Sequence, residues 1–293
     1  MAGADSLVRA LDYVEAGLGG DIDAGGMAAA ACVSPFHFSR LFSRAFLVGP
    51  WEWIVRRRLA EAARALMEKS TDVTEATYSF GFSGPDVFAR GMRRAYGVLP
   101  SDLLRGVAPR RPLLFPPSAD VVSLCADAKR APSVGVSVLA ARRLRGEVLL
   151  SAFPLSDAHD AWLVDAVKAV AAQAGTGDAL IVMGRGSFGQ VSLGVVSEGG
   201  MGSGNLEVQL PGGRWLACSI PDRSDLPTAR AWFRSVALSV LPVFAEREPE
   251  VIGLEPSPAL GCRIIAKVVD QSVQGQQPPS PRSGHPGRSS AHP

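Results

Sequence analysis

The chain has 293 residues, of which 47% are hydrophobic and 20% charged, enough for one large domain or two ordinary ones with real cores. No apolar run reaches the length of a membrane span, and residues 1–5 lack the basic start and hydrophobic stretch of a signal peptide. The four cysteines lie far apart. We therefore expect reduced thiols in a cytoplasmic protein, with neither a disulfide framework nor a cysteine metal site.

The net charge of +2 is distributed unevenly along the chain. Residues 34–111 hold 13 Lys and Arg against 7 Asp and Glu, whereas residues 1–33 hold 1 against 5. Residues 112–270 are nearly balanced, with 14 basic residues against 16 acidic ones. A basic excess confined to one segment is typical of a nucleic-acid-binding region.

In chain order, the first predicted helix spans residues 7–18, and a small-residue helix follows at 27–32. A third helix should begin at Ser34 as N-cap, with Pro35 in the first helical position. One of its faces is apolar and comprises Phe38, Leu41, Phe42 and Ala45; the other carries Ser39, Arg40, Ser43 and Arg44. Short polar and cationic side chains can reach base edges and phosphates, so these two helices form a predicted helix-turn-helix, although an isolated stretch of this kind could equally be an ordinary surface helix.

Residues 80–97 repeat this arrangement about fifty residues later. Phe88 corresponds to Phe38 and Arg90 to Arg40. A long helix over 51–69 joins the two units, and its inward stripe is predicted to comprise Trp51, Ile54, Val55, Leu59, Ala62 and Leu66. The arginine run 56–58 within it has two interpretations, a solvated charge run or a contact with DNA phosphates.

Residues 5–106 resemble the DNA-binding domain of the AraC/XylS family of transcription regulators. The motifs that carry the resemblance are Ser34-Pro35-x-His37-Phe38-Ser39-Arg40-x-Phe42, Gly81-Phe82-Ser83 and Tyr96-Gly97-x-x-Pro100-Ser101. The resemblance implies that double-stranded DNA is the partner and that RNA polymerase is a further possible partner. It implies base reading by Phe36, Ser39, Arg40, Ser43, Pro85, Asp86, Val87 and Arg90, and phosphate contacts by Arg44, Arg93 and Arg94.

Proline-rich residues 109–119 form a predicted linker. Beyond it, residues 146–154 match 213–221, and each match is followed by a helix and two strands. The chain is thus predicted as an all-α double helix-turn-helix domain, residues 1–108, followed by an α+β domain, residues 120–270, with a duplicated strand–helix–strand–strand unit. Residues 271–293 are rich in Pro, Ser, Gly and Gln and should be disordered.

The second domain resembles the GyrI-like effector-binding domain. The residues that chiefly carry this resemblance are 210–217, helix 225–241 and Leu254-Glu255. The resemblance implies a small-molecule site in which Glu255 binds a lipophilic cation, with Trp215, Trp232 or Trp162 nearby. Ser257 stands where the family has tyrosine, and a Tyr/Asp-rich turn of the first repeat is missing, which puts the ligand class in doubt.

Other chemistry is not favoured by the sequence. Gly184-Arg185-Gly186-Ser187-Phe188-Gly189 has dinucleotide-loop spacing, but residues 190–196 alternate like a strand, so a β-hairpin is predicted. The four histidines are scattered without metal-ligand spacing. We expect no cofactor, no metal and no membrane contact, and a regulator rather than an enzyme. The alternatives are a second domain that hydrolyses small molecules with Glu255 as general base, or one that binds no ligand and contacts RNA polymerase.

Overall fold

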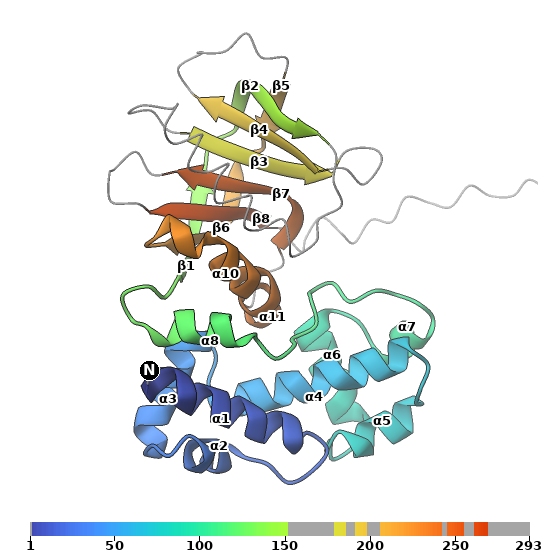
Figure 1. The fold of residues 1–293 in the computed structure, drawn as a ribbon. Coiled ribbons are helices and arrows are strands. Elements are labelled where there is room, and N and C mark those ends of the chain that lie inside the picture. The colour runs from blue at the N-terminus through green and yellow to red at the C-terminus, as the bar shows by residue number, and fades with distance from the viewer. Residues whose placement is uncertain are drawn as a thin grey trace, which may run out of the picture.

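The computed structural model describes residues 2–151, 179–185, 191–197, 206–241, 245–254 and 261–268. Helices fill the N-terminal part and a sheet fills the C-terminal part, with further helices between the two (Figure 1). The helices are α1 Ala2–Ala16, α2 Ala24–Ala30, α3 Pro35–Phe46, α4 Pro50–Met67, α5 Val73–Ser79, α6 Pro85–Tyr96, α7 Pro100–Leu104, α8 Ala119–Ala126, η2 Arg223–Asp225, α10 Leu226–Trp232, η3 Phe233–Ala237 and α11 Leu238–Val240. None of the helices in these residues is both long and apolar enough to cross a bilayer.

Local capping explains where the helices of the N-terminal part begin. Asp23 accepts a hydrogen bond from the Gly26 amide, and Asp72 accepts one from the Glu75 amide, at the starts of α2 and α5. Ser34 accepts from the His37 amide, and Pro35 is the first residue of α3, as predicted. Two helix pairs, α2 with α3 and α5 with α6, are joined by α4, so the predicted double helix-turn-helix is confirmed.

The central helix α4 is buried around most of its circumference. From Trp53 to Ala63 only Val55 and Glu61 are partly exposed. The predicted inward position of Trp51 is therefore wrong, because its side chain is 53% exposed while Trp53 is fully buried. A helix that is enclosed on all sides loses the one-sided periodicity from which its inward stripe was predicted.

The arginine run 56–58 is neither solvated nor available to phosphate, so both interpretations are wrong. Arg57 is 1% exposed and forms ion pairs with Glu15 and Glu61. Arg58 donates to the carbonyls of Leu18 and Gly20, at 2.9 and 2.6 Å. These arginines connect α4 to distant parts of the helical region, because Glu15 and the carbonyls of Leu18 and Gly20 lie about 40 residues away in the sequence.

The predicted linker, residues 109–119, contains no helix or strand before α8 begins at Ala119. It is nevertheless packed against the helices. Leu114 is fully buried, and its amide donates to the Tyr96 hydroxyl at 3.4 Å. α8 then lies against α1 and α3 with Val121, Val122, Leu124 and Cys125 buried. This segment is therefore part of the helical core.

The sheet of the described residues has eight strands in the order β1-β6-β8-β7-β3-β4-β2-β5, and neighbouring strands are antiparallel. The strands are β1 Ser133–Leu139, β2 Arg142–Ser151, β3 Ala179–Arg185, β4 Val191–Ser197, β5 Leu206–Leu210, β6 Gly213–Ile220, β7 Ala245–Leu254 and β8 Cys262–Val268. Leu139 pairs with Gly213 and Arg142 pairs with Leu210, so the ladder of β2 with β5 continues the register of β1 with β6. Residues 133–146 thus pair with residues 206–219 in one register, with a break at residues 140–141 and 211–212.

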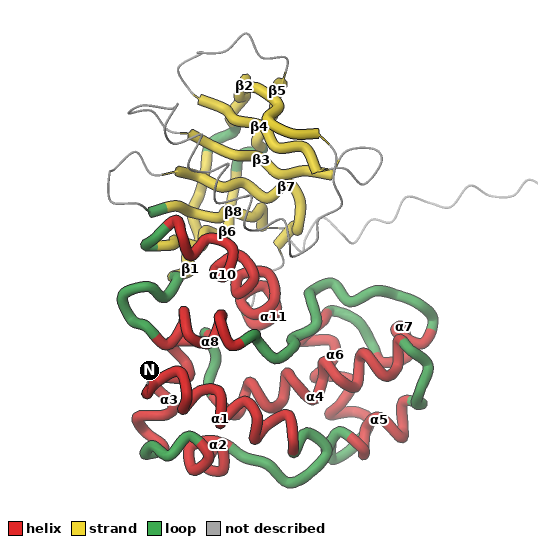
Figure 2. Tube along the Cα trace, viewed as in Figure 1, coloured by secondary structure: helices red, strands yellow, loops and turns green. Residues whose placement is uncertain are grey.

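Within the described residues, the predicted strands overlap β2, β3, β4, β6, β7 and β8, whereas the sequence did not predict β1 and β5. The antiparallel pairing of β3 with β4 agrees with the predicted glycine-rich hairpin. Of the two predicted helices of this domain, the second is formed by α10, η3 and α11, and the first lies outside the described residues. This second helix separates the sheet from the helical part of the molecule (Figure 2).

Candidate DNA-binding site

The first candidate reading surface is the exposed face of α3. Phe36 is 74% exposed, Ser39 and Arg40 are exposed, and Ser43 is half-buried. The Arg40 guanidinium lies over the Phe36 ring, 5.8 Å from the ring centroid. The opposite side of α3 is fixed in the core by Phe38, Phe42 and Phe46. All four predicted base-reading residues of this helix therefore lie on one accessible face.

The second surface is the corresponding face of α6. The predicted base-reading residues Pro85, Asp86, Val87 and Arg90 are exposed, as are Arg93 and Arg94 in the last turn. Gly84 is the N-cap, and no side chain caps this helix, in contrast to Ser34 at α3. Gly91 faces α4, where an added Cβ would lie 3.2 Å from a methyl carbon of Leu59. Its lack of a side chain permits close packing of α6 on α4.

The C-terminal end of α6 is held by the segment that follows the helical repeat. Arg111 donates to the carbonyl of Ala95 at 3.1 Å and to that of Arg94 at 3.4 Å. Burial and the nearby charge of Arg56 lower the pKa of Arg111 to about 10, so it stays cationic at neutral pH. Carbonyls at the end of a helix lack partners within it, and a cation there also complements the helix dipole.

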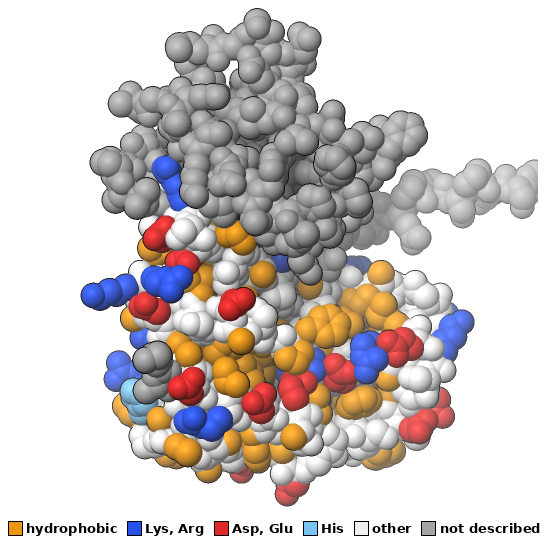
Figure 3. Space-filling view, viewed as in Figure 1, with side chains coloured by type: hydrophobic (Ala, Val, Ile, Leu, Met, Phe, Trp, Pro, Cys, Tyr) orange, Lys and Arg blue, Asp and Glu red, His pale blue; other side chains and the backbone are white. Residues whose placement is uncertain are grey.

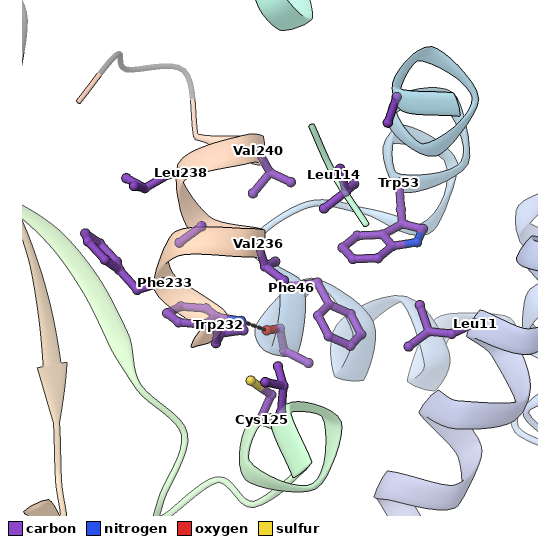
Figure 4. Packing of buried hydrophobic residues seen from close by; sticks show 14 of the residues in the cluster. Leu11, Phe46, Trp53, Leu114, Cys125, Trp232, Phe233, Val236, Leu238 and Val240 are labelled. Atoms are coloured by element: carbon purple, nitrogen blue, oxygen red, sulfur yellow. Dashed lines mark hydrogen bonds between the residues drawn. The ribbon is translucent and has the colours of Figure 1, made fainter. Parts of the chain in front are cut away.

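The C-terminal end of α3 is held by the second domain. The Trp232 indole Nε1 donates to the Ala45 carbonyl at 3.0 Å, and both side chains are buried (Figure 4). The Arg44 side chain, a predicted phosphate ligand, is exposed and donates to the Ala126 carbonyl of α8 at 2.9 Å. Contact of Arg44 with a phosphate would therefore compete with this hydrogen bond.

The face of the helical part shown in Figure 3 carries acidic and basic side chains close together, without a continuous basic surface. The exposed faces of α3 and α6 have a different composition. They carry Arg40, Arg44, Arg90, Arg93 and Arg94 against a single carboxylate, Asp86. Exposed cationic helices on a rigid core can enter the major groove and contact phosphates and base edges.

Of the residues predicted to form a small-molecule site, Trp215 and Trp232 lie among the described residues. On β6, Leu216 and Cys218 belong to the core cluster that includes α10, whereas Trp215 does not. Because successive residues of a strand point to opposite faces, Trp215 lies on the side of the sheet away from Trp232. The Lys267 ammonium lies 5.5 Å from the Trp215 ring centroid. Glu255 and Trp162 lie outside the described residues.

The sequence does not reveal the residues that hold the C-terminal ends of α3 and α6. From the sequence, Trp232 is expected to bind a ligand, and Arg111 is expected to lie in a linker. Their partners, the carbonyls of Ala45 and Ala95, belong to the main chain, and main-chain acceptors carry no sequence signal. Among the described residues no group of three His, Cys, Asp or Glu side chains is arranged to hold a metal.

Comparison with known proteins gives a match over the helical part. Residues 27–106 match a family model described as a helix-turn-helix domain. The regulatory protein PocR of Salmonella typhimurium is 29% identical over 92 residues, which are 31% of this chain and 30% of that protein. The XylDLEGF operon transcriptional activator of Pseudomonas putida is 32% identical over 106 residues, 35% of this chain and 33% of that protein. The chain thus spans about a third of the length of these curated relatives.

Solved structures also match about a third of the chain. A Chromobacterium violaceum transcriptional regulator of the AraC-type is 22% identical, with a TM-score of 0.33 over 34% of this chain and 89% of the other. A probable AraC family transcriptional regulator from Rhodopseudomonas palustris is 29% identical, also with a TM-score of 0.33, over 36% and 98% of the two chains. By the family model, the N-terminal region contains a helix-turn-helix domain, and the curated relatives similar to this chain over about 100 residues are a regulatory protein and a transcriptional activator.

Proposed function

We propose that this protein is a cytoplasmic, sequence-specific transcription regulator of the AraC/XylS family. Its recognition helices α3 and α6 enter successive major grooves on one side of a DNA duplex, about 34 Å apart. The observation that carries this proposal is the pair of cationic helix faces presented by one core. Phe36 and Val87 supply apolar contacts suited to thymine methyl groups, and Arg40 and Arg90 supply donors suited to guanine.

Arg40→Ala tests the recognition assignment. We expect it to weaken binding to the best site by about 1–3 kcal/mol and to relax sequence preference at one position, because a base contact is lost. Competition mobility-shift assays with sites selected from random DNA measure both effects. Arg64→Ala is the control, since Arg64 is an exposed α4 arginine that pairs with Glu61 and Glu68. If Arg40→Ala kept the affinity and the preference of the parent, α3 would not be the reading helix we propose.

For the second domain we propose a small-molecule-sensing role and a GyrI-like fold. Two features support the fold. The strand order is symmetric about the central pair of β7 and β3. Going outward from this pair, β7, β8 and β6 of one half correspond to β3, β4 and β2 of the other. The described strands of each half also follow the chain order of the repeat detected in the sequence, β2, β3 and β4 in one half and β6, β7 and β8 in the other. Trp215 and Glu255 remain the proposed ligand residues, and Trp232 is assigned instead to the contact with α3.

Lipophilic cations are the proposed ligands of this domain. We expect them to quench the tryptophan fluorescence of the full chain, because aromatic faces and a carboxylate in a low-dielectric site both attract positive charge. Glu255→Gln should weaken this quenching severalfold, whereas Glu147→Gln, on β2, should leave it unchanged. Equal binding of neutral, anionic and cationic compounds would exclude Glu255 from the site. Turnover of a bound compound would instead favour the hydrolase alternative.

A further inference from the structure

The helix formed by α10, η3 and α11 has two buried faces. Phe233 and Leu238 lie on the side away from the N-terminal helices, whereas Val236 and Val240 face Phe46, Trp53 and Leu114 (Figure 4). These side chains form one continuous core cluster with those of α1, α3 and α4. The second domain therefore shares its core with the DNA-binding domain.

Two buried hydrogen bonds fix this helix against the DNA-binding domain. At one end the Trp232 indole donates to the carbonyl of Ala45, in the last turn of α3. At the other end Arg56 of α4 donates from Nη1 to the Ser239 carbonyl at 2.8 Å. The two anchors lie on either side of η3, a five-residue π-helical segment, Phe233–Ala237. Segments of this kind place side chains out of the regular α-helical register.

These two hydrogen bonds connect the second domain to both α3 and α6. Trp232 contacts α3 directly through the Ala45 carbonyl. Arg56, which binds Ser239, also accepts at its own carbonyl a hydrogen bond of 3.3 Å from the hydroxyl of Tyr96, the last residue of α6. Tyr96 is 1% exposed, and burial raises the pKa of its hydroxyl to about 12, so at neutral pH the hydroxyl keeps the proton that it donates.

The carbonyls in the last turn of α3 show that Trp232 fixes the position of this helix in addition to packing against it. Leu47, in a left-handed conformation with φ of 65°, donates its amide to the Ser43 carbonyl. The Ala45 carbonyl has no such partner within the helix and is bound by Trp232 instead. A buried carbonyl is costly to leave unpaired, so the last turn of α3 is held at the place where the indole can reach it.

We propose that Trp232 is a positioning residue for DNA reading, which holds α3 in the orientation that its base contacts require. The second domain is then a structural part of the first reading unit. This inference rests on the proposed reading of DNA by α3 and α6. It predicts that a change made far from the DNA alters recognition of one half of the operator.

Trp232→Phe in the full chain tests this inference, because it removes the indole donor and keeps an aromatic ring. The parent is first measured on its selected site and on two versions of it, one scrambled in the α3 half and one in the α6 half. We expect Trp232→Phe to weaken binding to the intact site severalfold and to shrink the penalty for scrambling the α3 half. The penalty for scrambling the α6 half should stay close to that of the parent.

Phe233→Leu is the control. Phe233 is 1% exposed and belongs to the same helix, but it lies on the side away from the N-terminal helices. This substitution should leave both scrambling penalties unchanged. Should Trp232→Phe fold poorly, Val236→Ala loosens the same contact more mildly, and the same pattern should appear at reduced size.

An equal loss on the intact and both scrambled sites would mean that Trp232 contributes only to stability, and would overturn the inference. So would unchanged binding by Trp232→Phe and Val236→Ala. If the parent itself lost nothing when either half was scrambled, the proposed reading by α3 and α6 would be wrong and the inference would fail with it. The parent measurements alone therefore separate the two failures.

Discussion

Replacing Arg57 by alanine is expected to destabilise the protein by about 3–5 kcal/mol, because it leaves buried acceptors without their cation. The Arg57 guanidinium is 1% exposed and contacts Glu15 of α1, Glu61 of α4 and the Leu114 carbonyl of the following segment. Burial opposes its charge, but hydrogen bonds and charges of the two glutamates outweigh burial and raise the pKa of Arg57. One side chain thus joins three parts of the helical core.

Urea unfolding followed by circular dichroism measures this loss. Arg64→Ala is the matched control, since Arg64 lies two turns further along α4 and pairs with Glu61 and Glu68. Its side chain is 48% exposed, and exposed ion pairs contribute little, so the unfolding midpoint should hardly change. A similar midpoint for parent and Arg57→Ala would show that the Arg57 network does not stabilise the core.

The starts of the helices could be predicted from the sequence because capping is local. Ser34, Pro35 and Asp72 each lie within three residues of the groups that they organise. The exposed faces of α3 and α6 could be predicted for the same reason, since an amphipathic helix displays its polar side in the sequence. Six strands of the second domain were found through their internal repeat.

The contacts between distant segments could not be predicted. Arg56, Arg57 and Arg58 resemble a solvated run because their partners, Ser239, Glu15 and Leu18, are 183, 42 and 40 residues away. Trp232 resembled a ligand-binding aromatic because its acceptor is a main-chain carbonyl 187 residues away. A buried cation or indole is explained only by the groups around it, and here the fold supplies them.

The two tryptophans at the start of α4 should differ greatly in their contribution to stability. Trp53 is fully buried, and its ring centroid lies 5.5 Å from that of Phe42 and 4.9 Å from that of Phe46. Trp53→Ala should therefore cost about 3–5 kcal/mol, through lost apolar burial and the cavity left between α3 and α4. Trp51→Ala removes a side chain that is 53% exposed, and a change of within about 0.5 kcal/mol is expected.

Trp53→Phe supplies the intermediate case. It keeps an aromatic ring against Phe42 and Phe46 while removing part of the volume, so its cost should fall between those of the two alanine variants. The three variants are compared by urea unfolding under one set of conditions. Because Phe42 and Phe46 lie on α3, a large loss from Trp53→Ala would also show that α4 fixes the first recognition helix. Equal losses from Trp51→Ala and Trp53→Ala would contradict the packing of α3 on α4 described above.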